Sequence, residues 1–207
     1  MLFPIVSIAT GVPSFRKYNL TLSHKYHFIW FRVAKNGSRT ILNSLYKNRI
    51  KLDLGEEFKI RYPVHTYKNY YKFAVARNPW DRLVSCWHGK ILRKNAWGFP
   101  ESLYNKLQDF SEFVDHVADH DLEECDAHMA LQTSLIDLNE LNYLIRMESF
   151  EKDVTRVFRD LGINEFKLEI RNRTKNRKHY THYYTNESRK KVEKIYEKDI
   201  RILGYNY

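Results

Sequence analysis

The feature that most constrains the fold is a change of pattern within residues 26–46. Residues 28–33 are mostly aromatic or β-branched, a composition typical of a buried strand. Apolar side chains then recur at helical spacing, at Ile41, Leu42 and Leu45. The chain therefore passes from a strand to a helix through a short polar loop, and in an α/β protein such a turn is a place where anions bind.

This loop contains two cations, a glycine and two hydroxyl groups, in the order Lys35, Asn36, Gly37, Ser38, Arg39 and Thr40. Backbone N–H groups at a helix N-terminus are unpaired and carry partial positive charge, so they bind phosphate or sulfate well. Gly37 allows close approach of the backbone, and Lys35 adds a mobile charge. The common nucleotide-triphosphate pattern, Gly-x-x-x-x-Gly-Lys-Ser/Thr, is not present. An anion site and an ordinary polar turn explain this segment equally well on its own.

A second strand-to-helix passage strengthens the anion hypothesis. Residues 71–76 form a strong strand pattern, after which Asn78 suits a helix N-cap and Pro79 suits the first helical position. Arg77 lies at the carboxyl end of this strand, and Ser85 lies in the second turn of the helix. A guanidinium group and a hydroxyl can hold one phosphate from two sides. The alternative is that Arg77 pairs with a carboxylate and that Ser85 is helix surface.

The remaining patterns predict one α/β domain, with residues 1–25 as an N-terminal arm and 26–207 as the domain. A third strand is expected within 141–147, and helices are expected to end at Gly162 and Gly204. Segment 171–184 is strongly basic with interleaved aromatic residues, as is shown by RNRTKNRKHYTHYY. It could bind nucleic acid, close over a nucleotide, or be a solvated loop.

Composition limits the class of protein. The chain has 207 residues, 43% of them hydrophobic, which suits one domain with a substantial core. Its net charge of +10 favours anionic partners such as nucleotides, nucleic acid, acidic glycans or a membrane surface. The two cysteines are too few for a disulfide framework, and no segment is long enough to cross a membrane. We therefore expect a soluble, cytoplasmic protein; a catalytic domain of a longer membrane-anchored protein is the alternative.

Two groups of polar residues have no clear role from position alone. His65 precedes the second strand and would by position be a surface histidine. Asp126, His128 and Gln132 lie within residues 125–136, where no second His or Cys stands at metal-ligand spacing, so an ordinary structural or substrate-facing role is favoured over a metal site. We therefore expect no metal.

Taken together, these segments resemble the PAPS-dependent sulfotransferases of the carbohydrate type, where PAPS is 3′-phosphoadenosine 5′-phosphosulfate. Residues 31–40 resemble the 5′-phosphosulfate loop, 73–87 the 3′-phosphate element, and 172–205 the C-terminal region of that family. The resemblance implies a single α/β domain in which a parallel β-sheet is flanked by helices, as in P-loop nucleotide kinases. Two strand-to-helix turns at one sheet edge would each hold one anionic group of the nucleotide.

The resemblance also implies roles for individual residues. The loop from Lys35 to Thr40 would bind the 5′-phosphosulfate, and Lys35 would also neutralise the leaving phosphate oxygen. Arg77 and Ser85 would bind the 3′-phosphate, and Arg173 would also contact the nucleotide. His65 stands about where the family places its catalytic base, with the fallback candidates Glu148, Asp126 and His128.

The expected acceptor is a carbohydrate or glycoconjugate, without nucleic acid as a partner, and segments 89–108 and 119–140 are the expected walls of its site. The alternatives are a small-molecule kinase, a basic nucleic-acid-binding module, and a sulfotransferase-like protein that binds the nucleotide without catalysis.

Overall fold

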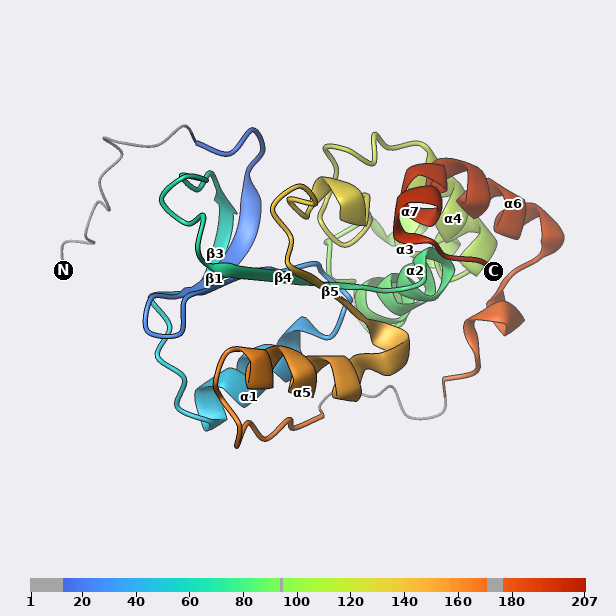
Figure 1. Ribbon diagram of the computed structural model, residues 1–207. Coiled ribbons are helices and arrows are strands. Elements are labelled where there is room, and N and C mark those ends of the chain that lie inside the picture. The colour runs from blue at the N-terminus through green and yellow to red at the C-terminus, as the bar shows by residue number, and fades with distance from the viewer. Residues whose placement is uncertain (1–12, 94, 171–176) are drawn as a thin grey trace.

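A five-stranded sheet in the order β3-β1-β2-β4-β5 forms the centre of the molecule (Figure 1). The computed structural model describes residues 13–93, 95–170 and 177–207. The strands are β1 (Tyr18–Ser23), β2 (Phe28–Phe31), β3 (Leu54–Ile60), β4 (Tyr71–Ala76) and β5 (Tyr143–Arg146). The α-helices are α1 (Ser38–Lys47), α2 (Pro79–Trp87), α3 (Glu101–Lys106), α4 (Phe110–Ala118), α5 (Phe150–Asp160), α6 (Asn186–Ile195) and α7 (Glu197–Leu203). Single turns of other helix types are η1 (His88–Leu92), η2 (Gln132–Ser134), η3 (Met147–Ser149) and η4 (Tyr180–Tyr183).

The sheet is mixed rather than wholly parallel. Strands β2, β4 and β5 pair in parallel, whereas β1 pairs antiparallel with both β2 and β3. The predicted α/β class and the single helix-flanked sheet are confirmed, and the exception is β1. Its residues lie in the segment predicted to be an N-terminal arm, yet Leu20 and Leu22 are buried between two strands. The sheet therefore begins at Tyr18, before the expected domain start at residue 26.

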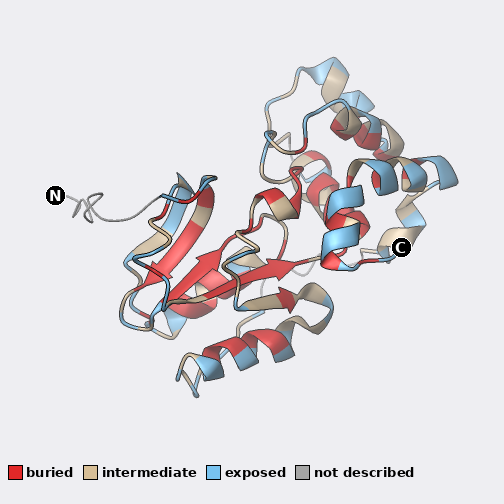
Figure 2. Cartoon of the chain, turned by 45° about the horizontal axis from the view of Figure 1, so that its top comes forward, coloured by how far each residue is buried: buried red, intermediate tan, exposed pale blue. Residues whose placement is uncertain are grey.

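The centre of the sheet is buried on both faces, which explains why β2 is a continuous apolar run (Figure 2). Phe28 and Trp30 pack in the cluster that includes side chains of α1 and α5, whereas Ile29 and Phe31 pack in the cluster on the opposite face. A third cluster joins α2 to α4 and α6, away from β1 and β3. Each strand-to-helix turn is thus held by packing on both sides.

Local signals set several helix boundaries, those at Asn78, Pro79 and Gly204 as predicted. The side chain of Asn78 accepts hydrogen bonds from the backbone of the first turn of α2, and Pro79 occupies the first helical position. Thr185 forms a capping box with Ser188 at the start of α6. Gly204 ends α7 in the left-handed conformation. Among the described helices, none is both long and apolar enough to span a bilayer.

Candidate active site

An open cleft of about 2550 Å³ lies where β2 and β4 end. Ligands of open α/β sheets bind at this edge, outside the carboxyl ends of the strands. Both predicted turns contribute to its lining, because Lys35 of the first and Arg77 of the second line the same cleft. Ser85 lines it as well, from α2. The structure therefore brings the two predicted anion sites together.

The first turn leaves the positive end of α1 uncompensated. Gly37 is the N-cap, with φ of 75°, and neither a side-chain cap nor an acidic residue in the first turn is present. A Cβ on Gly37 would lie 2.8 Å from the ring of Phe150, so the loop fits its surroundings only with glycine. Lys35 also adopts a left-handed backbone, with φ of 71°. The tight loop turns the start of α1 toward the cleft.

Not every residue of the loop faces the cleft. Lys35, Gly37, Ser38, Arg39 and Thr40 line it. Ser38 donates its hydroxyl hydrogen to the carbonyl of Val33, at 2.9 Å, and so closes the loop.

Asn36 points inward instead. Its side chain is fully buried, and its Nδ2 donates to the carbonyl of Val75 at 2.6 Å and to Oε1 of Gln132 at 2.7 Å. Asn36 therefore anchors the loop to the end of β4 and does not offer its side chain to a ligand.

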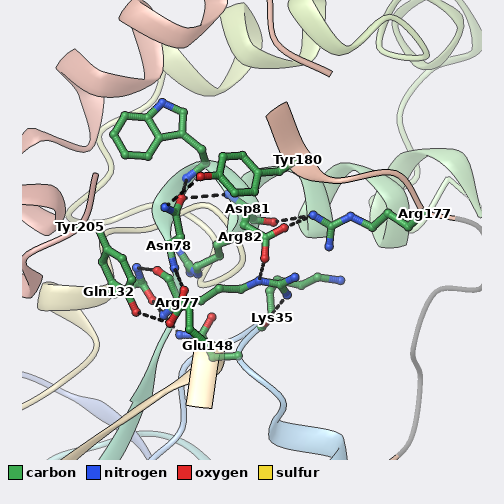
Figure 3. Close-up of polar contacts among 12 residues, drawn as sticks. Lys35, Arg77, Asn78, Asp81, Arg82, Gln132, Glu148, Arg177, Tyr180 and Tyr205 are labelled. Atoms are coloured by element: carbon green, nitrogen blue, oxygen red, sulfur yellow. Dashed lines mark hydrogen bonds and ion pairs between the residues drawn. The ribbon is translucent and has the colours of Figure 1, made fainter. Parts of the chain in front are cut away.

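Gln132 is the residue that joins the two turns, a connection that was not predicted from the sequence. Besides receiving the bond from Asn36, its Oε1 accepts from the N–H of Arg77 at 3.0 Å, and its Nε2 donates to the carbonyl of Arg77 at 2.9 Å (Figure 3). Its own N–H donates to Asp199 of α7 at 2.7 Å. Gln132 is fully buried, and nothing in its neighbouring residues indicates that it connects the two turns.

Lys35 carries the most perturbed charge in the loop. Burial, together with the neighbouring cations Arg77, Lys90 and Arg39, lowers the pKa of Lys35 to about 8. Its side chain lies against Gly89 of η1. Four cations near one cleft edge, without a matching number of carboxylates on the same turn, favour a multiply charged anion there.

Arg77 makes the carboxylate contact that was the predicted alternative, and it also bonds to the backbone of the first turn. Its Nη1 donates to the carbonyl of Lys35 at 2.9 Å, and its Nε pairs with Asp81 at 2.7 Å (Figure 3). The other carboxylate oxygen of Asp81 pairs with Arg177, from the C-terminal basic segment. Although burial acts to raise it, the pKa of Asp81 lies below its usual value because the two guanidinium groups flank the carboxylate.

The basic segment therefore reaches the cleft. Arg177 and Tyr180 both line it, and neither was singled out from the sequence. Arg173, which was predicted to contact the nucleotide, lies outside the described residues. The observed contact of Arg177 with Asp81 favours the reading of this segment as a cover for an anion site.

His65 does not join these residues. It is exposed, lies in the turn that precedes β4, and is not among the residues that line the cleft. The same turn packs Tyr67 against His24, which directly follows β1. His24 therefore lies beside the starts of β2 and β4, opposite the strand ends that line the cleft. Strand β4 has six residues, so its two ends are about 20 Å apart. The predicted role of His65 as the base is not supported by this placement.

The fallback candidates do line the cleft, in two different settings. Glu148 has its carboxylate occupied, because Oε1 accepts from the N–H of Asn78 at 3.2 Å and Oε2 accepts from Tyr205 at 3.3 Å. His128 lies 2.7 Å from Asp126, between Nδ1 and Oδ1. Glu148 thus fastens the C-terminal residues to the second turn, whereas His128 contacts Asp126 through Nδ1 and lines the cleft with a partly exposed side chain.

Comparison with known proteins agrees with this geometry. A model described as the sulfotransferase family matches residues 18–206, nearly the whole chain. The chain belongs to the sulfotransferase family. No curated protein and no solved structure shows significant similarity to it. The match begins at the first residue of β1, so this sulfotransferase includes the strand that the sequence patterns left in the arm.

Membership of the family establishes the reaction class of this sulfotransferase as transfer of a sulfuryl group. The cations and the open helix end at the first turn suit the sulfuryl donor. Within the described residues, no group of three or more His, Cys, Asp or Glu side chains is arranged to hold a metal ion. Residues from both expected acceptor walls also line the cleft, including Lys90 and Arg93 from the first and Cys125 and His128 from the second.

Proposed function

We propose that this sulfotransferase transfers the sulfuryl group of PAPS to a hydroxyl group of a carbohydrate. The observation that carries the proposal is the direct connection between the two turns. Arg77 bonds to the carbonyl of Lys35, and Gln132 bonds to both turns. PAPS carries two separated anionic groups, and two rigidly joined cationic turns at one sheet edge suit such a ligand.

The hydrogen-bond donors and the charge of the first turn fit the 5′-phosphosulfate. Gly37 has no Cβ, and Phe150 occupies the space that a Cβ would need. The loop is therefore preorganised for the ligand. The uncapped start of α1 supplies N–H groups, and Lys35 supplies a charge. Asn36 would hold the loop in place rather than touch the ligand, which revises its predicted role.

The side-chain hydrogen-bond donors of the second turn fit the 3′-phosphate. Arg77 and Ser85 line the cleft together, and Arg177 is paired to the same carboxylate as Arg77. Asp81 holds both guanidinium groups in position, so the charge-assisted bonds to a phosphate would need little reorganisation. In this proposal, Arg177 is the residue through which the C-terminal basic segment contacts the nucleotide.

PAPS, when bound, supplies the sulfuryl group and a phosphate leaving group. The chain's own residues would then bind and orient both ends and neutralise developing charge. Lys35 would face the bridging phosphate oxygen, where negative charge grows as the S–O bond breaks. Holding the donor in line with the acceptor hydroxyl would accelerate the transfer, because the reacting groups are already oriented.

A carbohydrate acceptor is supported by the resemblance and by the wide polar cleft. The part of the cleft away from the two turns is lined by Lys90, Arg93 and Glu124 as well as by apolar side chains. Groups that donate and accept hydrogen bonds in an open cleft suit a polyhydroxylated substrate.

The first test is transfer of radiolabelled sulfate from PAPS to a panel of glycans and glycolipids. Calorimetry with adenosine 3′,5′-bisphosphate, compared with ATP and magnesium, tests the donor site independently of the acceptor. The proposal predicts heat with the bisphosphate and weaker heat with ATP and magnesium. Absence of binding to the bisphosphate would reject PAPS as donor; preferential binding of ATP and magnesium would favour the kinase alternative. Salt-dependent binding of RNA with no transfer would favour the nucleic-acid alternative.

A further inference from the structure

A histidine and an aspartate face the cleft from a segment that the two nucleotide turns hold in place. Of the described residues that line the cleft, two are histidines, His128 and His179. His179 is exposed and its Nδ1 lies 2.9 Å from the hydroxyl of Thr181. His128 is more enclosed, with 31% of its side chain exposed, and it has a carboxylate partner.

The aspartate fixes both the backbone and the ring of His128. Oδ1 of Asp126 accepts from the N–H of His128 at 2.9 Å and lies 2.7 Å from its Nδ1. A carboxylate on Nδ1 favours the tautomer that carries its hydrogen there, which leaves the lone pair on Nε2. The edge of the ring packs at 81° to the plane of Trp97, which restricts its orientation.

A buried arginine ties this segment to the first turn. Arg82 of α2 is 2% exposed. Its guanidinium group donates to the carbonyls on both sides of His128, at Ala127 (2.8 Å) and Ala130 (2.7 Å), and its Nε donates to Ala34 (3.1 Å). Ala34 directly precedes Lys35. The same side chain therefore sets the position of His128 relative to Lys35.

The other end of the segment is tied to the second turn. Gln132 bonds to Asn36 and to both backbone groups of Arg77. With Arg82 at one end and Gln132 at the other, residues 127–132 cannot move independently of the proposed nucleotide site. Groups held by buried, fully directed hydrogen bonds are preorganised, as a catalytic group needs to be.

We propose that His128 is the base that removes the proton of the acceptor hydroxyl, and that Asp126 positions it. This inference rests on the proposed function. The acceptor O–H gives its proton to Nε2 of His128 while the acceptor oxygen forms a bond to sulfur. The bond from sulfur to the bridging phosphate oxygen breaks, and its electron pair stays on that oxygen, beside Lys35. Asp126 then faces the imidazolium ion that has formed.

The surroundings keep His128 neutral at neutral pH. The charged groups that face it are Asp126 from its own segment, Lys90 from η1 and Lys35 from the first turn. Burial lowers the pKa of His128 from its usual value; Asp126 acts to raise it, and the two lysines act to lower it. A neutral imidazole is the form that can accept a proton.

The alternatives are less suited to this role. Both carboxylate oxygens of Glu148 already accept hydrogen bonds, from the N–H of Asn78 and the hydroxyl of Tyr205, so this carboxylate is engaged in holding the C-terminal residues. His65 lies outside the cleft lining. Asp126 itself has a pKa held well below its usual value, mainly through its hydrogen bond to His128, so it is a poor proton acceptor at neutral pH.

The test compares the sulfuryl-transfer activity of His128→Ala, Asp126→Asn and His65→Ala with that of wild type, with PAPS as the donor. Turnover is measured on the acceptor that takes most label in the panel, or as release of labelled sulfate to water if no acceptor is labelled. We expect His128→Ala to lower kcat by about 10²- to 10⁴-fold, with affinity for adenosine 3′,5′-bisphosphate within about twofold of wild type. Added imidazole should restore part of the turnover of His128→Ala. It should restore no turnover to a variant that has lost activity through misfolding.

Asp126→Asn separates positioning from catalysis. Because Asp126 raises the pKa of His128, its removal should move the acid limb of the kcat–pH profile to lower pH while the plateau falls. The base assignment is overturned if His128→Ala keeps kcat within about threefold of wild type, or if imidazole fails to rescue a folded, nucleotide-binding His128→Ala. It is also overturned if His65→Ala shows the larger loss. Failure of every variant and of wild type to bind the bisphosphate would instead reject the proposed function.

Discussion

The two strand-to-helix turns at the sheet edge use opposite solutions at the helix N-terminus. At α1 the N-cap is Gly37, which has no side chain, and no acidic residue lies in the first turn. At α2 the side chain of Asn78 accepts from two backbone N–H groups, Pro79 has no N–H to satisfy, and Asp81 lies in the first turn. One helix end is open and the other is closed by its own residues.

Because of this difference, the two turns would bind an anion in different ways. An open helix end offers backbone N–H groups and its dipole, so the first turn is suited to binding through the backbone. A closed end offers neither, so the second turn depends on the side chains of Arg77 and Arg177, both held by Asp81. Two sites that look alike in the sequence therefore respond to different substitutions.

The largest expected effect comes from filling the space at the open helix end. Gly37→Ala places a methyl group 2.8 Å from the ring of Phe150 and forces a left-handed alanine. We expect affinity for adenosine 3′,5′-bisphosphate, measured by calorimetry, to fall about a hundredfold through loss of two charge-assisted backbone bonds.

Gly162→Ala is the matched control. Gly162 has a φ of 76°, nearly that of Gly37, but a Cβ there would meet nothing within 4 Å. Thermal unfolding should show a backbone cost of about 1–2 kcal/mol for both variants, with an additional cost from the clash only in Gly37→Ala. Equal losses of nucleotide affinity in the two variants would contradict the proposed backbone site.

The next largest effect is expected at the second turn. Arg77→Ala removes the guanidinium group that bonds to Lys35 and Asp81, and we expect the affinity for the bisphosphate to fall about thirtyfold. Arg77→Lys should recover little, because an ammonium group cannot make both contacts at once. Arg159→Ala, an exposed arginine on α5, is the control and should bind like wild type. Full recovery by lysine would mean that charge alone matters at this turn.

Much of this comparison could be predicted from local sequence. Both strand–turn–helix units, the N-cap at Asn78 and the family were predicted correctly, because each depends on residues that are neighbours along the chain. Strand β1 was missed because its pattern is short and its stability comes from pairing with β2 and β3 on either side.

The residues at the site that lie elsewhere than their local sequence suggests have the same origin. Asn36 lies in a polar loop, yet its side chain points inward, where its Nδ2 donates to Gln132, a residue far away in sequence. His65 is near Arg77 in sequence, but a strand of six residues separates the edges on which they lie. Arg177 could be located only through its pairing with Asp81, which no local pattern encodes.

A pH titration tests the first turn alone. Because the pKa of unliganded Lys35 is lowered to about 8, the side chain is charged below that pH and loses its charge above it. A bound dianion would raise this pKa, so affinity for the bisphosphate should be constant below pH 7 and fall about tenfold between pH 7 and pH 9. Calorimetry near pH 8 in buffers of different ionisation enthalpy should show proton uptake on binding. Lys35→Arg should bind without that uptake, and a wild-type affinity that does not change up to pH 9 would contradict the lowered pKa.

The smallest effect on binding is expected at the closed helix end. Asn78→Ala removes a cap that accepts from Trp80 at 3.0 Å and Asp81 at 3.3 Å, and it should lower the free energy of unfolding by about 1–2 kcal/mol in chemical denaturation. Thr185→Ala removes the cap of α6, which is not among the residues that line the cleft, and should cost about 1 kcal/mol. Since the proposed phosphate contacts of the second turn are side chains, both variants should bind the bisphosphate within about threefold of wild type. A loss in Asn78→Ala as large as that in Arg77→Ala, with Thr185→Ala unaffected, would show that the start of α2 also holds the anion through its backbone, and the contrast between the two turns would not hold.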